Sequence, residues 1–228
     1  MLDFIKPKYK KFFIDKELFI FDMDETVIKT DKLNYRVYQF VLKKIYQIGL
    51  TKDDWNEFFS GKRPKESITD YLQKKYKIDF NIILYNRILK QLRHQKNKEL
   101  EKFDIKVIDG FYNLVKNLRN NKYKVALATS TVKNYVKIFT RRTKIEQFFD
   151  FIVTGEDINI GKPNPEIYVT TMKHFNINPE KTVIFEDSKA GILAAKMSGA
   201  TVIKIGSNSR LINNSHIQIR DYKELLNL

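Results

Sequence analysis

The sequence contains no cysteine. Disulfide bonds, thiol nucleophiles and cysteine-ligated metals are therefore excluded, which fits a cytoplasmic protein. Long apolar runs are also missing, since none approaches the ~18 residues that a membrane span needs. The apolar run Leu18–Phe21 is too short for the core of a signal peptide. We therefore predict a cytoplasmic protein without a membrane partner.

Acidic residues are few compared with basic ones, at 27 Asp and Glu against 42 Lys and Arg, so the net charge is +15. Such a charge attracts anions at long range, and both nucleic acid and phosphorylated metabolites are candidates. No helix-turn-helix, RRM or zinc-finger pattern is present, so nucleic acid is not the expected partner, although a non-catalytic nucleic-acid-binding protein stays an alternative. We expect a monomer or a weak dimer.

Short apolar runs alternate with helical spacing over most of the chain. The runs predicted to be strands are 18–21, 123–128, 151–154, 182–185, 201–205 and 217–219. Helical patterns lie between most of them, and a terminal helix is expected after the last. Strands and helices in alternation are typical of an α/β fold with a doubly wound parallel sheet.

Residues 31–99 interrupt this alternation. Their apolar residues recur at spacings of three and four, which predicts four helices and no strand. Phe80 is assigned to the fourth helix, with Asp79 as its N-cap. The segment holds 16 Lys and Arg against 8 Asp and Glu, a charge of +8. We predict a core domain of residues 1–30 and 100–228 with a helical insert of residues 31–99.

Two carboxylates, Asp22 and Asp24, follow the apolar run Leu18–Phe21. In strand geometry they point to the same side, and they would repel each other unless a cation lies between them. Ligands of open α/β sheets bind at the carboxyl ends of the strands, so this spacing favours a metal site. An ordinary Asp-rich turn is the alternative for this segment alone.

Three further polar groups follow other predicted strands. They are the hydroxyls of 129–131, Lys162 between Gly161 and Pro163, and the carboxylates of Glu186 and Asp187. Each alone also fits a structural role, as a helix cap, a loop lysine or a turn. Together they would meet in one crevice, where hydroxyls and backbone N–H groups suit phosphate and carboxylates suit a hard cation.

The motifs Asp22-Met23-Asp24-Glu25-Thr26, Thr129, Gly161-Lys162-Pro163 and Glu186-Asp187-Ser188 together resemble the haloacid dehalogenase superfamily. The likeness is greatest to the phosphatase branch with a helical cap inserted after the first motif, which includes beta-phosphoglucomutase and phosphoglycolate phosphatase. Dehalogenase members lack the second aspartate, so Asp24 favours phosphoryl transfer. The resemblance implies a Rossmannoid core with an α-helical cap formed by the insert.

The resemblance also assigns roles to residues. Asp22 is the expected nucleophile and Asp24 the general acid and base. The expected cofactor is Mg²⁺, and the expected phosphate ligands are hydroxyls and a lysine. The implied metal site consists of Asp22, Asp24 through its carbonyl, Glu186 and Asp187; the implied phosphate site of Thr129, Ser130 and Lys162; and the candidate substrate contacts of Arg63, Lys96, Thr131 and Asn134.

Three positions depart from the family pattern. Glu25 replaces the usual glycine, Lys29 a common aspartate, and Asn34 the cap-hinge histidine of mutases. The last difference favours a Mg²⁺-dependent phosphatase of a small phosphorylated metabolite, with a sugar phosphate as one candidate. A phosphosugar mutase remains the alternative, because Thr131, Lys133 and Asn134 resemble the mutase's seat for a second phosphate.

Overall fold

The computed structural model describes residues 2–79, 81–206 and 215–227. The chain divides into two compact units. The core unit contains residues Met1–Lys29 and Ile105–Leu228, and the insert unit contains residues Thr30–Asp104. Phe80, assigned above to the fourth helix of the insert, lies outside the described residues.

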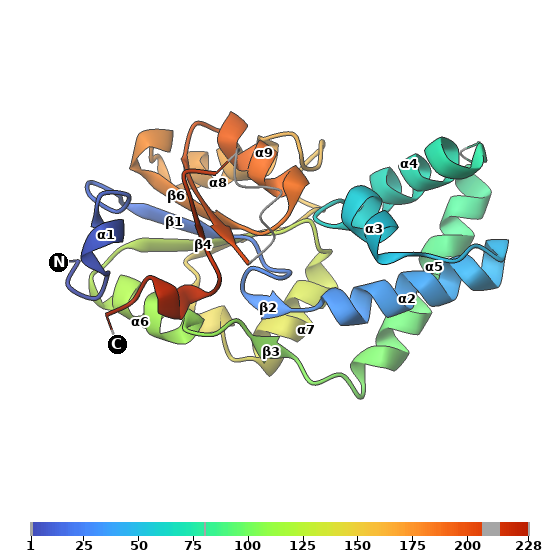
Figure 1. Cartoon of the computed structure of the whole chain (residues 1–228), viewed down its shortest axis with the longest axis horizontal. Helices are drawn as coiled ribbons and strands as arrows, with labels where there is room; N and C mark the ends of the chain where they lie inside the picture. Colours follow the sequence, from blue (N-terminus) through green and yellow to red (C-terminus); the bar gives the residue numbers. More distant parts are fainter. Residues whose placement is uncertain (1, 80, 207–214, 228) are drawn as a thin grey trace. The chain divides into compact units, whose positions relative to one another are not determined.

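The core unit is built on a six-stranded sheet in the order β5-β4-β1-β6-β7-β8. Every neighbouring pair in it is parallel, and β1 lies in the middle (Figure 1). The strands are β1 (Leu18–Phe21), β4 (Lys124–Ala128), β5 (Phe151–Val153), β6 (Thr182–Glu186), β7 (Thr201–Ile205) and β8 (Ile217–Ile219). The predicted doubly wound α/β fold is confirmed.

Helices cover both faces of this sheet, which explains why β1 is apolar at every position. Its alternate residues Leu18 and Ile20 belong to a core cluster shared with α8 and α9, while Phe21 packs edge-on against Phe111 of α6. Figure 1 shows α8 and α9 on one side of the sheet and α6 on the other. The helices are α6 (Phe111–Asn120), α7 (Lys133–Arg142), α8 (Glu166–Phe175) and α9 (Lys189–Met197).

A second, two-stranded sheet was not predicted. It pairs β2 (Ile28–Lys29) with β3 (Lys106–Val107) in antiparallel orientation. Two-residue strands are too short to produce a recognisable alternation in the sequence. The pair lies where the chain leaves the core unit and returns to it.

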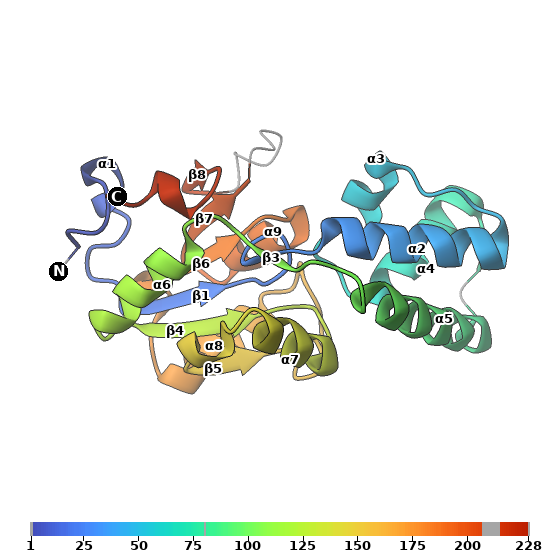
Figure 2. The same cartoon turned by 90° about the horizontal axis from the view of Figure 1, so that it is seen from below.

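The two ends of the chain lie side by side in the core unit (Figure 2). The backbone N–H of Lys6 donates to the carbonyl of Leu225, and helix α1 (Pro7–Lys10) follows. The predicted terminal helix is wrong, because the chain forms only a 3₁₀ turn at Tyr222–Glu224. Shortly after the turn, Leu226 forms an antiparallel bridge with Ile5, so the chain leaves helical geometry there.

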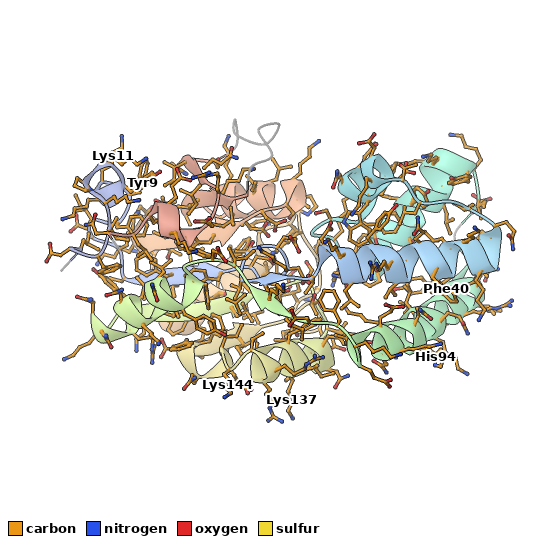
Figure 3. The ribbon with its side chains drawn as sticks, turned by 60° about the horizontal axis from the view of Figure 1, so that its bottom comes forward. Tyr9, Lys11, Phe40, His94, Lys137 and Lys144 are labelled. Carbon is orange, nitrogen blue, oxygen red and sulfur yellow. The ribbon has the colours of Figure 1, made fainter. Side chains whose placement is uncertain are left out.

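The insert unit is helical, as predicted. Its helices are α2 (Asp31–Tyr46), α3 (Lys52–Asp54) continued by a π-helical turn at Trp55–Phe59, α4 (Pro64–Tyr76) and α5 (Ile82–Leu100). The predicted N-cap Asp79 is wrong, since the side chain of Asn81 accepts from the N–H groups of Ile83 and Leu84. Figure 3 shows Phe40 and His94 on the surface of this unit, where both are exposed.

None of the helices in the described parts of the chain is long and apolar enough to span a bilayer.

The packing of β1 leads to a testable expectation for stability. Phe21 is fully buried and stacks on Phe185 with a centroid distance of 4.6 Å. Phe21→Ala should lower the free energy of unfolding by about 3–5 kcal/mol, because it leaves a cavity between the sheet and α6. Ile14→Ala is the control in the same unit. Because Ile14 is 54% exposed, this substitution should lower the free energy of unfolding by about 0.5 kcal/mol or less. Similar losses in urea denaturation of the two variants would contradict this packing.

Candidate active site

Three adjacent strands end at the same edge of the core sheet. Asp22 follows β1, Thr129 follows β4, and β6 ends at Glu186, directly before Asp187. The backbone N–H of Asp22 continues the ladder by donating to the carbonyl of Phe185. The sheet order therefore brings together carboxylates that are far apart in the sequence, at the edge where such sheets bind their ligands.

Lys162 lies at the centre of this group with its side chain fully buried. Its Nζ donates to Asp22 Oδ1 and to Glu186 Oε1, both at 2.6 Å, and lies 3.4 Å from the carbonyl oxygen of Ala128. Burial opposes the ammonium charge, but the carboxylates of Asp22 and Glu186 outweigh it and raise the pKa of Lys162 well above its usual value. The lysine therefore remains a cation and joins two strand ends.

Glu186 is fixed through both of its carboxylate oxygens. Besides Lys162, Oε1 accepts from the hydroxyl of Tyr168 at 3.0 Å. Oε2 accepts from the N–H groups of Asp187 (2.8 Å) and Ser188 (2.9 Å) and from the Ser188 hydroxyl. This carboxylate is thus held as part of the protein framework.

Two residues that support Glu186 received no role in the sequence analysis. Tyr168 reaches it from α8, and Gly191 leaves room for it on α9. A Cβ atom at Gly191 would lie 1.7 Å from Glu186 Oε1, so a larger residue there collides with the carboxylate. In the sequence, Tyr168 follows Lys162 and Gly191 follows Asp187 by a few residues, and this proximity is the signal that could have indicated them. Their contacts with Glu186 depend on the tertiary fold.

Asp22, Glu186 and Asp187 offer carboxylate oxygens that all lie within 4.8 Å of one another. Burial, with repulsion from the neighbouring carboxylates, raises the pKa of Asp22 and of Asp187 well above the usual range, and Lys162 only partly opposes this. Hard divalent cations prefer oxygen ligands, and a bound cation would stabilise carboxylates whose ionised form is otherwise unfavourable here. The donor set therefore fits a divalent metal.

The loop after β1 makes a tight turn that positions Asp24. The N–H groups of Val27 and Ile28 both donate to the carbonyl of Met23. Glu25 adopts the left-handed backbone region, with φ at 55°. Glycine adopts this conformation without strain, whereas residues with a side chain disfavour it. Glu25 nevertheless donates its N–H to the Ile28 carbonyl at 2.8 Å.

Thr131 contacts the second aspartate of the motif. Its hydroxyl donates to Asp24 Oδ2 at 2.6 Å, and its N–H donates to the hydroxyl oxygen of Thr129 at 3.2 Å. The structure thus brings Thr129 and Thr131 together with Asp24. Ser130 between them is half-buried, and Asn134 is exposed on α7.

The two candidate substrate residues of the insert lie on different helices. Arg63 precedes α4, and its guanidinium pairs with Glu66 at 2.5 Å. Lys96 is half-buried on α5. Their contact with a substrate stays a prediction.

The family model described as haloacid dehalogenase-like hydrolase matches residues 19–205. The chain belongs to this family. The match contains every motif on which the resemblance depended, from Asp22 to Asp187. The resemblance is thereby confirmed, and the chain is an enzyme of a hydrolase family.

Individual relatives of this haloacid dehalogenase-like hydrolase are named for two activities. A phosphorylated carbohydrates phosphatase of Thermotoga maritima is 29% identical over 217 residues, which cover 93% of this chain and 97% of the relative. A beta-phosphoglucomutase of Bacillus subtilis is 28% identical over 204 residues, covering 85% and 84%. The crystal structure of beta-phosphoglucomutase from Clostridium difficile shares the fold with a TM-score of 0.80 at 22% identity, covering 92% of this chain and 93% of that one.

The space left by Gly191 can be tested by adding one methyl group. Gly191→Ala should displace the Glu186 carboxylate and lower the free energy of unfolding by about 1–3 kcal/mol, as overpacking does in other cores. Gly49→Ala is the control, because no atom lies within 4 Å of a Cβ placed there. Equal thermal denaturation midpoints for the two variants would show that Glu186 is not confined as described.

The raised pKa values of Asp22 and Asp187 predict how stability depends on pH. Above the ordinary carboxyl pKa of 3.8, the folded protein holds protons that the unfolded chain has lost. Stability without metal should therefore fall as the pH rises above 3.8, and Mg²⁺ should reverse most of this fall. Asp187→Asn should flatten the metal-free dependence. Thermal denaturation in EDTA checks this, and a stability that rises over the same pH range would contradict it.

Proposed function

We propose that the protein is a Mg²⁺-dependent phosphatase of a small phosphorylated metabolite, acting through a phosphorylated Asp22. The observation that carries this proposal is the buried Lys162, which binds the first aspartate of the motif and Glu186 at 2.6 Å each. It supplies a fixed positive charge beside a carboxylate that must meet an anionic phosphate. The family to which the chain belongs, and the phosphatases among its relatives, support the same chemistry.

Asp22 is suited to attack phosphorus. Its Oδ1 is held by Lys162, which orients the carboxylate and leaves Oδ2 for the reaction. Mg²⁺ would be held by Asp22 and Asp187, with the Asp24 carbonyl, and would neutralise charge on the nucleophile and the phosphate. Glu186 supports the site indirectly, because its oxygens bind Lys162 and the backbone of Asp187.

Asp24 moves the protons in this scheme. When Asp22 bonds to phosphorus and the ester bond breaks, Asp24 gives its proton to the departing oxygen. Asp24 then takes a proton from water, which attacks phosphorus and releases Asp22 and inorganic phosphate. The hydroxyl of Thr131 orients the Asp24 carboxylate for both steps.

The transferring phosphate would be bound by Thr129, Ser130 and Lys162, where a fixed cation offsets the charge of the transition state. We propose a phosphorylated sugar as the substrate, on the ground of the Thermotoga maritima relative named for phosphorylated carbohydrates. Arg63, Lys96 and Asn134 are the candidate contacts for its remaining groups. The proposed location is the cytoplasm, in keeping with the absence of cysteine.

A phosphosugar mutase is the second candidate, favoured by similarity to the Bacillus subtilis beta-phosphoglucomutase. A mutase must prevent water from reaching the phosphorylated aspartate and needs a bisphosphate primer. Assays of hexose and pentose phosphates, with and without bisphosphate, separate the two reactions. Release of inorganic phosphate without primer supports the phosphatase, and isomerised sugar phosphate with negligible inorganic phosphate supports the mutase.

The nucleophile has its own test. Asp22→Asn should lower phosphatase turnover by about 10³-fold or more while the protein stays folded, because an amide does not form the covalent intermediate. Asp3→Asn serves as the control, since its side chain is 92% exposed and far from Asp22 in the sequence. Turnover near that of the unaltered enzyme in a folded Asp22→Asn protein would exclude this mechanism.

A further inference from the structure

A basic groove lies in the core unit and shares no residue with the carboxylate site. It has a volume of about 560 Å³, within the range of pockets that hold small organic ligands. Strand β3 and the turn after it, the start of α6, the end of α7 and the C-terminal segment form it. Its lining is residues 105–110, Tyr112, 142–144 and Lys223.

Cations dominate the lining of the basic groove. Lys106, Arg142, Lys144 and Lys223 are all exposed, and Asp109 is the one carboxylate among the lining residues. Lys223 binds Asp109 at 2.9 Å. Its hydrogen bond and charge, with a contribution from Lys29, hold the pKa of Asp109 below its usual value. The four cations and the one carboxylate give the lining a net charge of +3.

Lys29 adds a further positive charge beside the basic groove. It lies directly opposite Lys106 in the antiparallel pair of β2 and β3. Directly opposed residues project on the same face, where like charges destabilise the pair. Lys29 departs from the family pattern, and the proposed phosphatase reaction gives it no task. An anion bound at this face would remove the repulsion.

The walls of the basic groove are formed before any ligand binds. Gly110 has φ at 82°, and a Cβ placed on it would lie 2.5 Å from the backbone nitrogen of Lys223, so the two segments are closely packed. The hydroxyl of Tyr112 donates to the carbonyl of Thr143, which fixes the ring while 37% of the residue stays exposed. The groove thus offers a fixed aromatic surface together with its cations.

We propose that the basic groove binds a small organic anion that carries two or more phosphate groups and a flat ring, as a nucleoside diphosphate does. The cations come from β3, the end of α7 and the C-terminal segment, so a ligand with more than one phosphate group can contact cations of different segments. Tyr112 provides the surface for the ring. This binding does not depend on the proposed phosphatase activity.

The test measures binding of ADP to the full chain by calorimetry in the presence of EDTA. Without a divalent metal, Asp22 and Asp187 repel phosphate, and turnover does not complicate the measurement. We expect one saturable site with a Kd on the order of 10–100 μM. The double variant Lys106→Glu/Lys144→Glu should weaken binding by about tenfold or more, because it reverses two charges of the lining.

The matched control is Lys137→Glu/Lys173→Glu, which changes the net charge equally at two exposed positions outside the basic groove. Figure 3 shows Lys137 and Lys144 on the same side of the core unit. The comparison of the two double variants therefore distinguishes binding in the basic groove from attraction by the positive charge of the protein as a whole. The control should weaken binding by about twofold or less. Equal weakening in both double variants, or unchanged binding in the first, would overturn the proposal. So would tight binding of single-stranded RNA without binding of ADP.

Discussion

The ion pairs of Lys162 are the interaction on which the core unit's functional edge depends. An ammonium group with no solvent exposure binds two carboxylates that belong to different strands, Asp22 after β1 and Glu186 at the end of β6. Removing one partner from such a buried group typically costs about 3–5 kcal/mol, because a charge is left without compensation. Tyr168 and the small residue Gly191 are further parts of the same arrangement.

The same ion pairs have a consequence for catalysis. One lysine balances only part of the negative charge of Asp22, Glu186 and Asp187. Burial raises the free-energy cost of the negative charge that is left unbalanced. The apo site is therefore destabilised by its own carboxylates and gains when a divalent cation binds. Under the proposed function, the site gives up stability without metal in return for charged groups that are preorganised for a cation and a phosphate.

The sequence was most informative where one local pattern determines one structure. Four apolar residues before Asp22 predicted a buried strand, and polar residues after three strands predicted a shared site, because parallel strands end at one edge. Contacts between distant segments left no such pattern. The hydrogen bond from Thr131 to Asp24, the two-residue strands β2 and β3, and the basic groove all depend on tertiary structure. At α5, Asp79 was the expected N-cap, whereas the side chain of Asn81 accepts from the first N–H groups of the helix.

The proposed mechanism depends on the transfer of a phosphoryl group to Asp22 beside Lys162. The most direct measurement is mass spectrometry of the peptide containing Asp22 after acid quenching during turnover of a sugar phosphate. The Asp24→Asn variant is studied beside the unaltered enzyme with acetyl phosphate, whose leaving group departs without a proton from Asp24, so that loss of the base slows hydrolysis alone and lets the intermediate accumulate. If Asp22 is the nucleophile, this peptide gains the mass of one phosphoryl group. Release of inorganic phosphate with no such gain in either protein, or a phosphoryl group on a different residue, would contradict it.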